Sequence, residues 1–272
     1  MRAARLPLFL AALIIAGCAS SPASRTATAT RIDSILAGQH RAPASRARDV
    51  HRHPRQTLLF FGLRPEMTVV EIAPAPGWYT EVLAPLLYDR GRYVAALALK
   101  PANEYGQREL AAYRDKLAEW PRLYDKVELV DLTPGQPLVP DGSADMIVTF
   151  RNIHNWMADG NADAAFASMY RALRPGGVLG VVEHRGNSQH PQDPQARTGY
   201  VNQSYAVKLI EGAGFRLVAT SEINANPKDT KDYPRGVWTL PPTYLEGDKD
   251  RERYAAIGES DRFTLKFVKP RR

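Results

Sequence analysis

From position 68 onward, the chain alternates short apolar runs with longer segments in which apolar residues recur every three or four positions. Short apolar runs are typical of buried strands, and the longer period is typical of helices that pack on a sheet. Alternating strands and helices form mostly parallel sheets. The pattern predicts seven strands, at residues 68–73, 93–98, 127–130, 145–150, 178–183, 216–221 and 263–268.

The predicted helices lie between these strands, at residues 78–87, 104–120, 165–173 and 201–213. No such helix separates the last two strands, because residues 223–261 are mostly polar and rich in proline. We therefore expect these two strands to pair antiparallel at the sheet edge. Long loops inside a domain often act as lids or binding arms, so residues 223–261 are interpreted as an insertion of that kind. The expected fold class is α/β, with a seven-stranded, mostly parallel sheet and an antiparallel last strand.

The first residues have the pattern of an export signal. Two arginines precede an apolar run over residues 8–16, which is too short to cross a bilayer. The run ends in Ile15-Ala16-Gly17-Cys18, which resembles the lipobox of bacterial lipoproteins. The resemblance implies that residues 1–17 are a signal peptide and that Cys18 receives a lipid, which anchors the protein to a membrane in the cell envelope, facing the periplasm or the exterior. The alternative is an uncleaved apolar leader with an unmodified cysteine.

Residues 18–31 consist largely of alanine, serine, threonine and arginine, with few large apolar side chains. Such a segment cannot build a core by itself, so we predict a flexible tether there. No repeat or second low-complexity stretch interrupts the remainder. One folded domain is expected over residues 32–272.

Composition and charge narrow the functional classes. Cys18 is the only cysteine in this sequence, which excludes an internal disulfide and a zinc site built from several cysteines. The net charge of +7 comes from basic residues scattered among acidic ones, which gives no nucleic-acid signature. The densest basic stretch, residues 41–55, is either a solvated helix face, which we favour, or a surface that lies against anionic lipid.

Polar side chains follow two predicted strands at the edge where parallel sheets bind their ligands. His154 and His184 are candidate catalytic bases, because imidazole titrates near neutral pH, although a structural hydrogen-bonding role is the commoner one for a histidine. With Glu183 and His190 they form a conceivable set of metal ligands. No pair has the i, i+4 spacing of a helical zinc motif, so no metal is predicted.

The segment Val69–Thr80 resembles the first motif of the class I S-adenosylmethionine-dependent methyltransferases. The resemblance implies that Glu71 and the following loop accommodate the sulfonium and amino-acid part of the cofactor. Ala73 and Ala75 stand where the family usually has glycine, and Gly77 is the third position of that loop. Tyr79 is a candidate to pack on adenine or substrate, with core packing as the alternative.

Three later segments resemble further methyltransferase motifs in order and spacing, which together extend the likeness over residues 48–270. Asp131 matches the residue that accepts a hydrogen bond from the adenine amino group; the alternative is an aspartate that caps its own loop. Asn152, in the run Phe150–Met157, is a further candidate for cofactor binding. The nearest likeness is to a little-characterised group of bacterial proteins. The resemblance implies a Rossmann-like fold, S-adenosyl-L-methionine as cofactor and a small-molecule methyl acceptor.

Two functional hypotheses follow. The favoured one is a methyltransferase. The other is a non-enzymatic envelope lipoprotein that uses the same fold, through its cleft or through residues 224–240, to bind a ligand or a protein. Leu97 motivates the second hypothesis, because the family has an acidic residue there that binds the ribose hydroxyls, and leucine cannot accept those bonds. The sequence does not indicate an oligomeric state.

Overall fold

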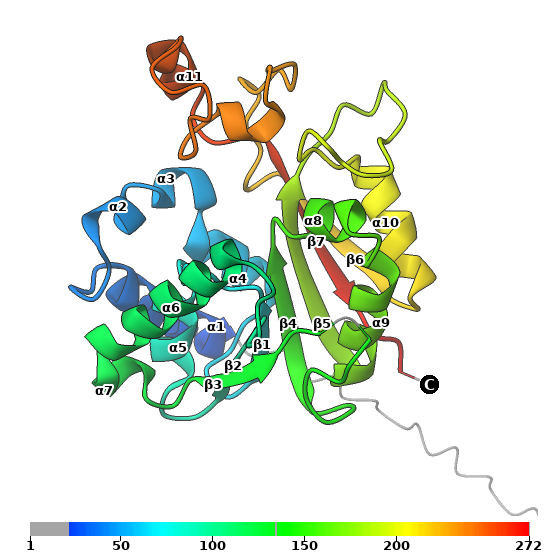
Figure 1. Cartoon of the computed structure of the whole chain (residues 1–272). Coiled ribbons are helices and arrows are strands. Elements are labelled where there is room, and N and C mark those ends of the chain that lie inside the picture. Colours follow the sequence, from blue (N-terminus) through cyan, green and yellow to red (C-terminus); the bar gives the residue numbers. More distant parts are fainter. Residues whose placement is uncertain (1–21, 134, 272) are drawn as a thin grey trace, which may run out of the picture.

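The computed structural model describes residues 22–133 and 135–271, and one sheet forms its centre (Figure 1). The strands lie in the order β3-β2-β1-β4-β5-β7-β6. Neighbouring strands from β3 through β5 pair in parallel, whereas β7 is antiparallel to both β5 and β6. The predicted α/β fold class is confirmed. The strands are β1 (Thr68–Ile72), β2 (Arg92–Leu97), β3 (Glu128–Asp131), β4 (Ala144–Phe150), β5 (Leu173–His184), β6 (Arg216–Ser221) and β7 (Arg262–Val268).

Helices cover both faces of the sheet, and the alternation of side chains along each strand separates two apolar layers. Val69 of β1 belongs to one buried cluster, while Val70 and Ile72 belong to the other. The first layer contains residues from α4 (Pro54–Phe61), α5 (Thr80–Leu87), α6 (Glu104–Glu119) and α7 (Pro121–Tyr124). The second contains residues from α8 (Ile153–Ala158), α9 (Ala162–Ala172) and α10 (Gln203–Gly212).

The strand order reverses between β1 and β4, since β2 and β3 lie on one side of β1 and β4 and β5 lie on the other. In open α/β sheets, ligands bind beyond the carboxyl ends of the strands at such a reversal. The loops that follow β1 and β4 are therefore the ones that the fold places at a ligand site.

Helix α1 (Pro22–Leu36) corrects the predicted tether, because residues 22–31 are helical. Thr28, Ala29 and Ile32 are buried, and Arg31 forms an ion pair with Asp89. The small side chains allow the helix to lie close to α4 and α5, so it packs without many large apolar residues. Composition alone did not indicate this. The signal peptide and residues 18–21 of the tether lie outside the described residues.

The basic stretch 41–55 contains α2 (Pro43–Arg46) and α3 (Asp49–Arg52), and it is not a uniformly solvated face. Arg41 is fully buried, and its guanidinium donates to Asp49 at 2.6 and 2.9 Å and to Glu81 at 3.3 Å. Arg52 is also buried. The favoured prediction of a solvated face is wrong for these two arginines, because carboxylates and apolar groups around them replace water.

The insertion 223–261 folds over the carboxyl ends of the strands, in the orange region at the top of Figure 1. It contains the short helix η1 (Gly236–Thr239) and α11 (Arg251–Ile257). The buried carboxylate of Asp229 holds it together by accepting hydrogen bonds from the Tyr200 hydroxyl at 2.9 and 3.0 Å and from the Asp261 N–H at 2.7 Å. The insertion is thus an ordered part of the domain.

No helix within residues 22–133 and 135–271 combines the length and the apolar character needed to cross a bilayer.

Candidate functional site

A cavity of about 680 Å³ opens at the carboxyl ends of the strands. Its volume falls in the range of small-molecule and cofactor sites, about 300–1,000 Å³. The wall is built by the loop after β1, the ends of β2, β4 and β5, the helices α3 and α6, and part of the insertion. Segments that are far apart in the sequence therefore meet at one hollow.

The loop after β1 adopts the tight conformation that the first motif predicts. Ala73 has a φ of 49° and Gly77 a φ of 94°, both in the left-handed region that favours glycine. A Cβ at Gly77 would lie 2.6 Å from Lys116 Cδ and 3.2 Å from Tyr113 Cε2, so a side chain there would displace its neighbours as well as strain the backbone. Ala73 accepts the same kind of backbone with a methyl group, which costs about 1 kcal/mol relative to glycine. Ala73 and Ala75 both line the cavity.

Glu71, at the carboxyl end of β1, presents a buried carboxylate to this cavity. The Tyr93 hydroxyl donates to its Oε2 at 2.6 Å. Burial raises the pKa of Glu71 from 4.5 to about 7, although Tyr93 and the charges of Arg52 and Arg151 act against that shift. A cationic ligand at this position would stabilise the ionised form of the carboxylate.

Asn152 and Tyr79 lie where the sequence analysis expects them, on the cavity wall. The Asn152 side chain donates to the Ile72 carbonyl at 3.0 Å and to the Thr149 hydroxyl at 3.1 Å, which ties the ends of β1 and β4 together. Tyr79 stacks on Phe150, with ring centroids 3.6 Å apart. Both side chains thus shape the floor of the cavity.

Asp131 ends β3, and its carboxylate is bonded to the loops that follow β2 and β3. Its carboxylate accepts hydrogen bonds from the Leu99 N–H at 2.9 Å and from the Thr133 hydroxyl, and these contacts lower its pKa. The neighbouring Leu132 lines the cavity, whereas Asp131 does not. The contacts match the alternative of an aspartate that caps its own loop.

On the β2 side of the cavity, Leu97 contributes an apolar wall without a polar side-chain atom. Helix α6 brings Glu109 to this cavity, and the Tyr105 hydroxyl donates to Glu109 Oε1 at 2.9 Å. Glu109 was not a site candidate, because it lies in the middle of a predicted helix and no motif marks it. Its Oε2 has no hydrogen-bond partner in the described part of the chain, so it can accept a bond from a ligand.

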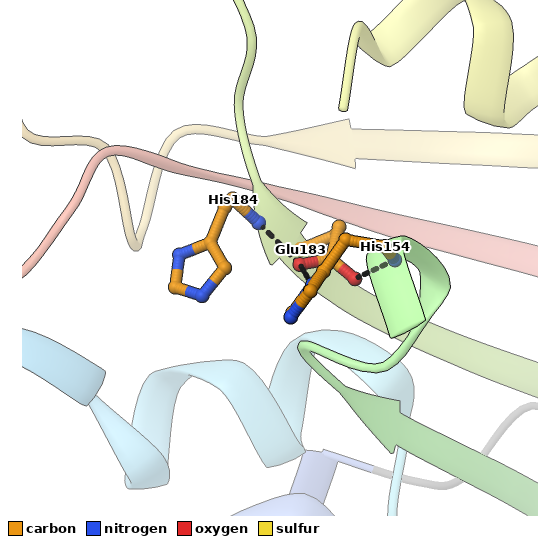
Figure 2. A group of neighbouring side chains, drawn as sticks. All are labelled: His154, Glu183 and His184. Carbon is orange, nitrogen blue, oxygen red and sulfur yellow. Dashed lines mark hydrogen bonds and ion pairs between the residues drawn. The ribbon is translucent and has the colours of Figure 1, made fainter. Parts of the chain in front are cut away.

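His154 and Glu183 form a buried dyad at the ends of β4 and β5 (Figure 2). His154 Nδ1 lies 3.1 Å from Glu183 Oε1. An ionised carboxylate only accepts, so Nδ1 is the donor in this pair, and in the neutral ring Nε2 is then the nitrogen with the free lone pair. His154 lines the cavity, and none of the described residues bonds its Nε2. This imidazole is thus oriented to accept a proton from a ligand.

The carboxylate of Glu183 is fully bonded within the protein. Its Oε1 also accepts the His184 N–H at 2.8 Å, and its Oε2 accepts the N–H groups of Ile153 at 2.6 Å and of His154 at 3.4 Å. These donors leave little capacity for another partner. The dyad resembles the carboxylate and histidine pairs that fix the tautomer of a catalytic imidazole.

His184 lies beside the dyad, with its ring centroid 5.3 Å from that of His154. Its Nδ1 is hydrogen-bonded to the Ser260 hydroxyl. Burial lowers the pKa of His184 well below the ordinary value, and His154 and three nearby arginines lower it further. His184 is consequently neutral near pH 7, and a weaker base than an ordinary histidine.

The structure brings together three of the four residues considered as metal ligands, His154, Glu183 and His184, with one atom of each within 4.8 Å of the others. The spacing rule for a single helix did not anticipate this, since the residues come from two strand ends. Both Glu183 oxygens already accept N–H groups, and the sharing of His154 Nδ1 with Glu183 occupies another ligand atom. The contacts are those of a hydrogen-bonded cluster.

Other cavity residues were not singled out as site candidates by the sequence analysis. They include Arg48, Arg52, Arg151, Trp238, Glu259 and Arg262. The only signal for them is the density of arginine before residue 55, and the polar run after β4. Nothing in the sequence indicates that Glu259 and Arg262, more than two hundred residues from Arg48, share its cavity.

Comparisons with known proteins agree with this geometry. Residues 70–181 match the family profile described as "Methyltransferase domain". The ubiquinone/menaquinone biosynthesis C-methyltransferase of a Shewanella species is 31% identical over 166 residues, which are 61% of this chain and 59% of that protein. The chain thus matches less than two thirds of the length of this curated relative.

Solved structures share the fold at low identity. A S-adenosylmethionine-dependent methyltransferase from Aquifex aeolicus superposes with a TM-score of 0.56 at 15% identity, over 89% of this chain and 98% of the other. The [4+2]-cyclase SpnF superposes with a TM-score of 0.55 at 16% identity, over 91% and 96%. These matches establish the Rossmann-like methyltransferase fold. Because a cyclase shares it, they do not establish the reaction.

The raised pKa of Glu71 makes the stability of the domain depend on pH. The folded state holds the proton more tightly than the unfolded chain, so stability decreases as pH rises from about 4.5 through about 7. Glu71→Gln removes this effect. We expect the variant to gain on the order of 3 kcal/mol in free energy of unfolding over the parent between pH 4.5 and pH 8.

Urea unfolding at a series of pH values measures this gain. Glu128→Gln, which removes an exposed carboxylate paired with Arg92, is the control and should change little with pH. A difference between Glu71→Gln and the parent that stays constant from pH 4.5 to 8 would show that Glu71 is ionised throughout.

Proposed function

We propose that this protein is a S-adenosylmethionine-dependent methyltransferase that acts on a small-molecule acceptor, with His154 as the general base. The observation that carries the proposal is the meeting of the loop 73–77 with the His154–Glu183 dyad in one cavity. The match over residues 70–181 and the Shewanella relative support the same reaction. The reaction, its acceptor and the cofactor are proposals for the whole chain.

The residues present fit the cofactor at two places. Glu71 supplies a buried carboxylate beside the loop 73–77, where a sulfonium and an ammonium group would stabilise its charge. Glu109 supplies the carboxylate that Leu97 lacks, and we assign to it the hydrogen bonds from the ribose hydroxyls. Leu97 and Leu132 provide apolar contact on the same wall.

When bound, the cofactor supplies an electrophilic methyl group on a sulfonium. The protein then has to align the acceptor, exclude water and remove a proton if the nucleophile carries one. His154 Nε2 takes that proton. Glu183 keeps the imidazole in the tautomer that can do so and stabilises the positive charge that develops on the ring. Trp238 from the insertion meets the His154 ring edge to face, with centroids 6.0 Å apart, and shields it from solvent.

Cofactor binding is tested with S-adenosylhomocysteine by calorimetry. We expect Glu109→Gln to weaken binding about tenfold, because a charged hydrogen bond to a hydroxyl contributes about 1.5–3 kcal/mol. Glu104→Gln, an exposed carboxylate on the same helix, is the matched control and should bind like the parent. Absence of binding by the parent chain at millimolar ligand would refute the proposed function and favour a non-enzymatic binding protein.

The role of His154 is tested by transfer of a radiolabelled methyl group from S-adenosylmethionine to a small-molecule extract of the cell envelope. His154→Gln should lower the rate by about 10²- to 10⁴-fold, the usual contribution of a general base. Glu183→Gln should also lower it, and the double variant should be no slower than His154→Gln. His190→Gln, at an exposed histidine outside the cavity, is the control. Equal losses in His154→Gln and His190→Gln would exclude His154 as the base.

We also propose that the protein is a lipid-anchored resident of the cell envelope. The support is the sequence of residues 1–18, with its basic start, short apolar run and lipobox-like end. Cys18→Ser should abolish incorporation of radiolabelled palmitate and release the protein from the membrane fraction. Ser20→Ala should retain both the label and the membrane association. Label that persists in Cys18→Ser would rule out Cys18 as the lipidation site.

A further inference from the structure

Four arginine side chains line the part of the cavity next to the His154–Glu183 dyad. Arg48 and Arg52 come from the segment that contains α3, Arg151 follows β4, and Arg262 begins β7. We refer to them as the arginine cluster. Arg262 is the register partner of His184 across β5 and β7, and the Arg151 N–H bonds to the Val182 carbonyl at 2.7 Å. The arginine cluster therefore adjoins the strand ends that carry the proposed base.

One carboxylate, Glu259, pairs with three members of the arginine cluster. Arg48 Nε donates to it at 2.6 Å, Arg52 Nε at 3.4 Å, and Arg262 Nη2 forms a short ion pair with it. Burial alone would raise the pKa of Glu259, but these arginines hold it below the ordinary value. Glu259 is thus ionised and cannot neutralise more than one of the four guanidiniums.

The arginine cluster outnumbers the carboxylates that act on it. Glu71 and Glu183 also act on Arg151 or Arg52, so at most three negative charges oppose four positive ones. The Glu183 carboxylate is already bonded to His154 and to N–H groups, and Glu71 has a pKa of about 7. The excess of positive charge is therefore local to the arginine cluster, on one side of the cavity.

Several N–H groups of the arginine cluster have no partner. Arg52 and Arg262 are 4% and 3% exposed, yet Arg52 Nη2 and Arg262 Nε bond to no described residue, and the same is true of Arg48 Nη2. The guanidinium of Arg151 has no hydrogen bond or ion pair within the described chain. Burial, and then the positive charge of Arg262, lowers the pKa of Arg151 to about 10. Buried donors are almost always paired, so unpaired donors on arginines whose side chains line a cavity point to an acceptor that the protein itself does not supply.

We propose that the arginine cluster binds an oxyanion group of the methyl acceptor, a carboxylate or a phosphate. This inference rests on the proposed function, and it specifies the substrate class of that cavity. Guanidinium groups bind such oxyanions through paired N–H donors and remain charged when desolvated. An anion held here lies beside His154 and beyond β4, whereas Leu97, Leu132 and Glu109 belong to the β2 and β3 side. The cluster thus serves the acceptor rather than the nucleoside.

The test measures binding of inorganic phosphate, and separately of acetate, to the full chain saturated with S-adenosylhomocysteine. We expect phosphate or acetate to bind the parent and to bind at least tenfold more weakly to Arg151→Gln and Arg52→Gln. Arg55→Gln, an arginine from the neighbouring helix that pairs with Asp33, is the matched control and should bind like the parent. The ratio of phosphate to acetate affinity distinguishes a phosphorylated acceptor from a carboxylic acid.

Thermal unfolding separates this role from a structural one. Arg151 has no hydrogen-bond partner to lose, and the three other arginines of the cluster repel its charge. We therefore expect the thermal unfolding midpoint of Arg151→Gln to be about 2 °C above that of the parent. A lower midpoint together with unchanged anion binding would overturn the proposal, because Arg151 would then be a structural residue.

A second arm tests whether the arginine cluster holds the cofactor's own carboxylate. Methylthioadenosine lacks that carboxylate, so S-adenosylhomocysteine and methylthioadenosine should each bind Arg151→Gln as they bind the parent. Selective weakening of S-adenosylhomocysteine would overturn the proposal. If S-adenosylhomocysteine fails to bind the parent at all, the proposed function fails, while phosphate or acetate binding that depends on Arg151 would still identify the anion site. If the parent and every variant bind phosphate and acetate with equal affinity, the proposed role of the arginine cluster is also overturned.

Discussion

The buried carboxylate of Glu183 is the contact on which the arrangement of the site depends. It ends β5 and accepts N–H groups from the first turn of α8, from His184 and from the His154 ring. A single side chain therefore fixes the start of a helix, the end of a strand and the orientation of an imidazole. A buried carboxylate has to satisfy its oxygens in this way, since an unpaired one costs several kcal/mol. The contacts that satisfy the buried Glu183 carboxylate are therefore the same contacts that orient His154.

The opposite holds for the arginine cluster, where burial leaves groups unsatisfied. Arg41 shows how the same protein satisfies a buried guanidinium, with two bonds to Asp49 and one to Glu81. Arg52 and Arg151 form fewer hydrogen bonds than Arg41: the Arg52 side chain donates once, to Glu259, and the Arg151 guanidinium has no partner among the described residues. Both side chains line a cavity rather than the core, and such tension between stability and local structure is typical of functional sites. Glu259 holds the cluster together without neutralising it.

The fold itself carries less information about function than the site does. The Aquifex methyltransferase and the cyclase SpnF superpose on this chain almost equally well, although one is a methyltransferase and the other a cyclase. The information about function lies in the content of the cavity, namely the two-residue dyad, the arginine cluster and the apolar Leu97. The insertion over the strand ends adds Trp238 and Glu259 to that content.

The sequence by itself determined the sheet and its loops, because the period of apolar residues is a local property that burial imposes on each element. Six of the seven strands lie within one residue of their predicted bounds, whereas β5 begins five residues earlier than predicted, and Glu71, Asn152 and His154 lie on the cavity wall. The composition of residues 22–31 led to the wrong prediction of a tether, because the small side chains of α1 leave no strong helical pattern of apolar residues. Spacing did not reveal that Glu183 orients His154, that Glu109 faces Leu97's cavity, or that Arg48 and Arg262 share Glu259. The longest of these pairings joins residues 211 positions apart, and only the folding of the sheet and its insertion brings such side chains together.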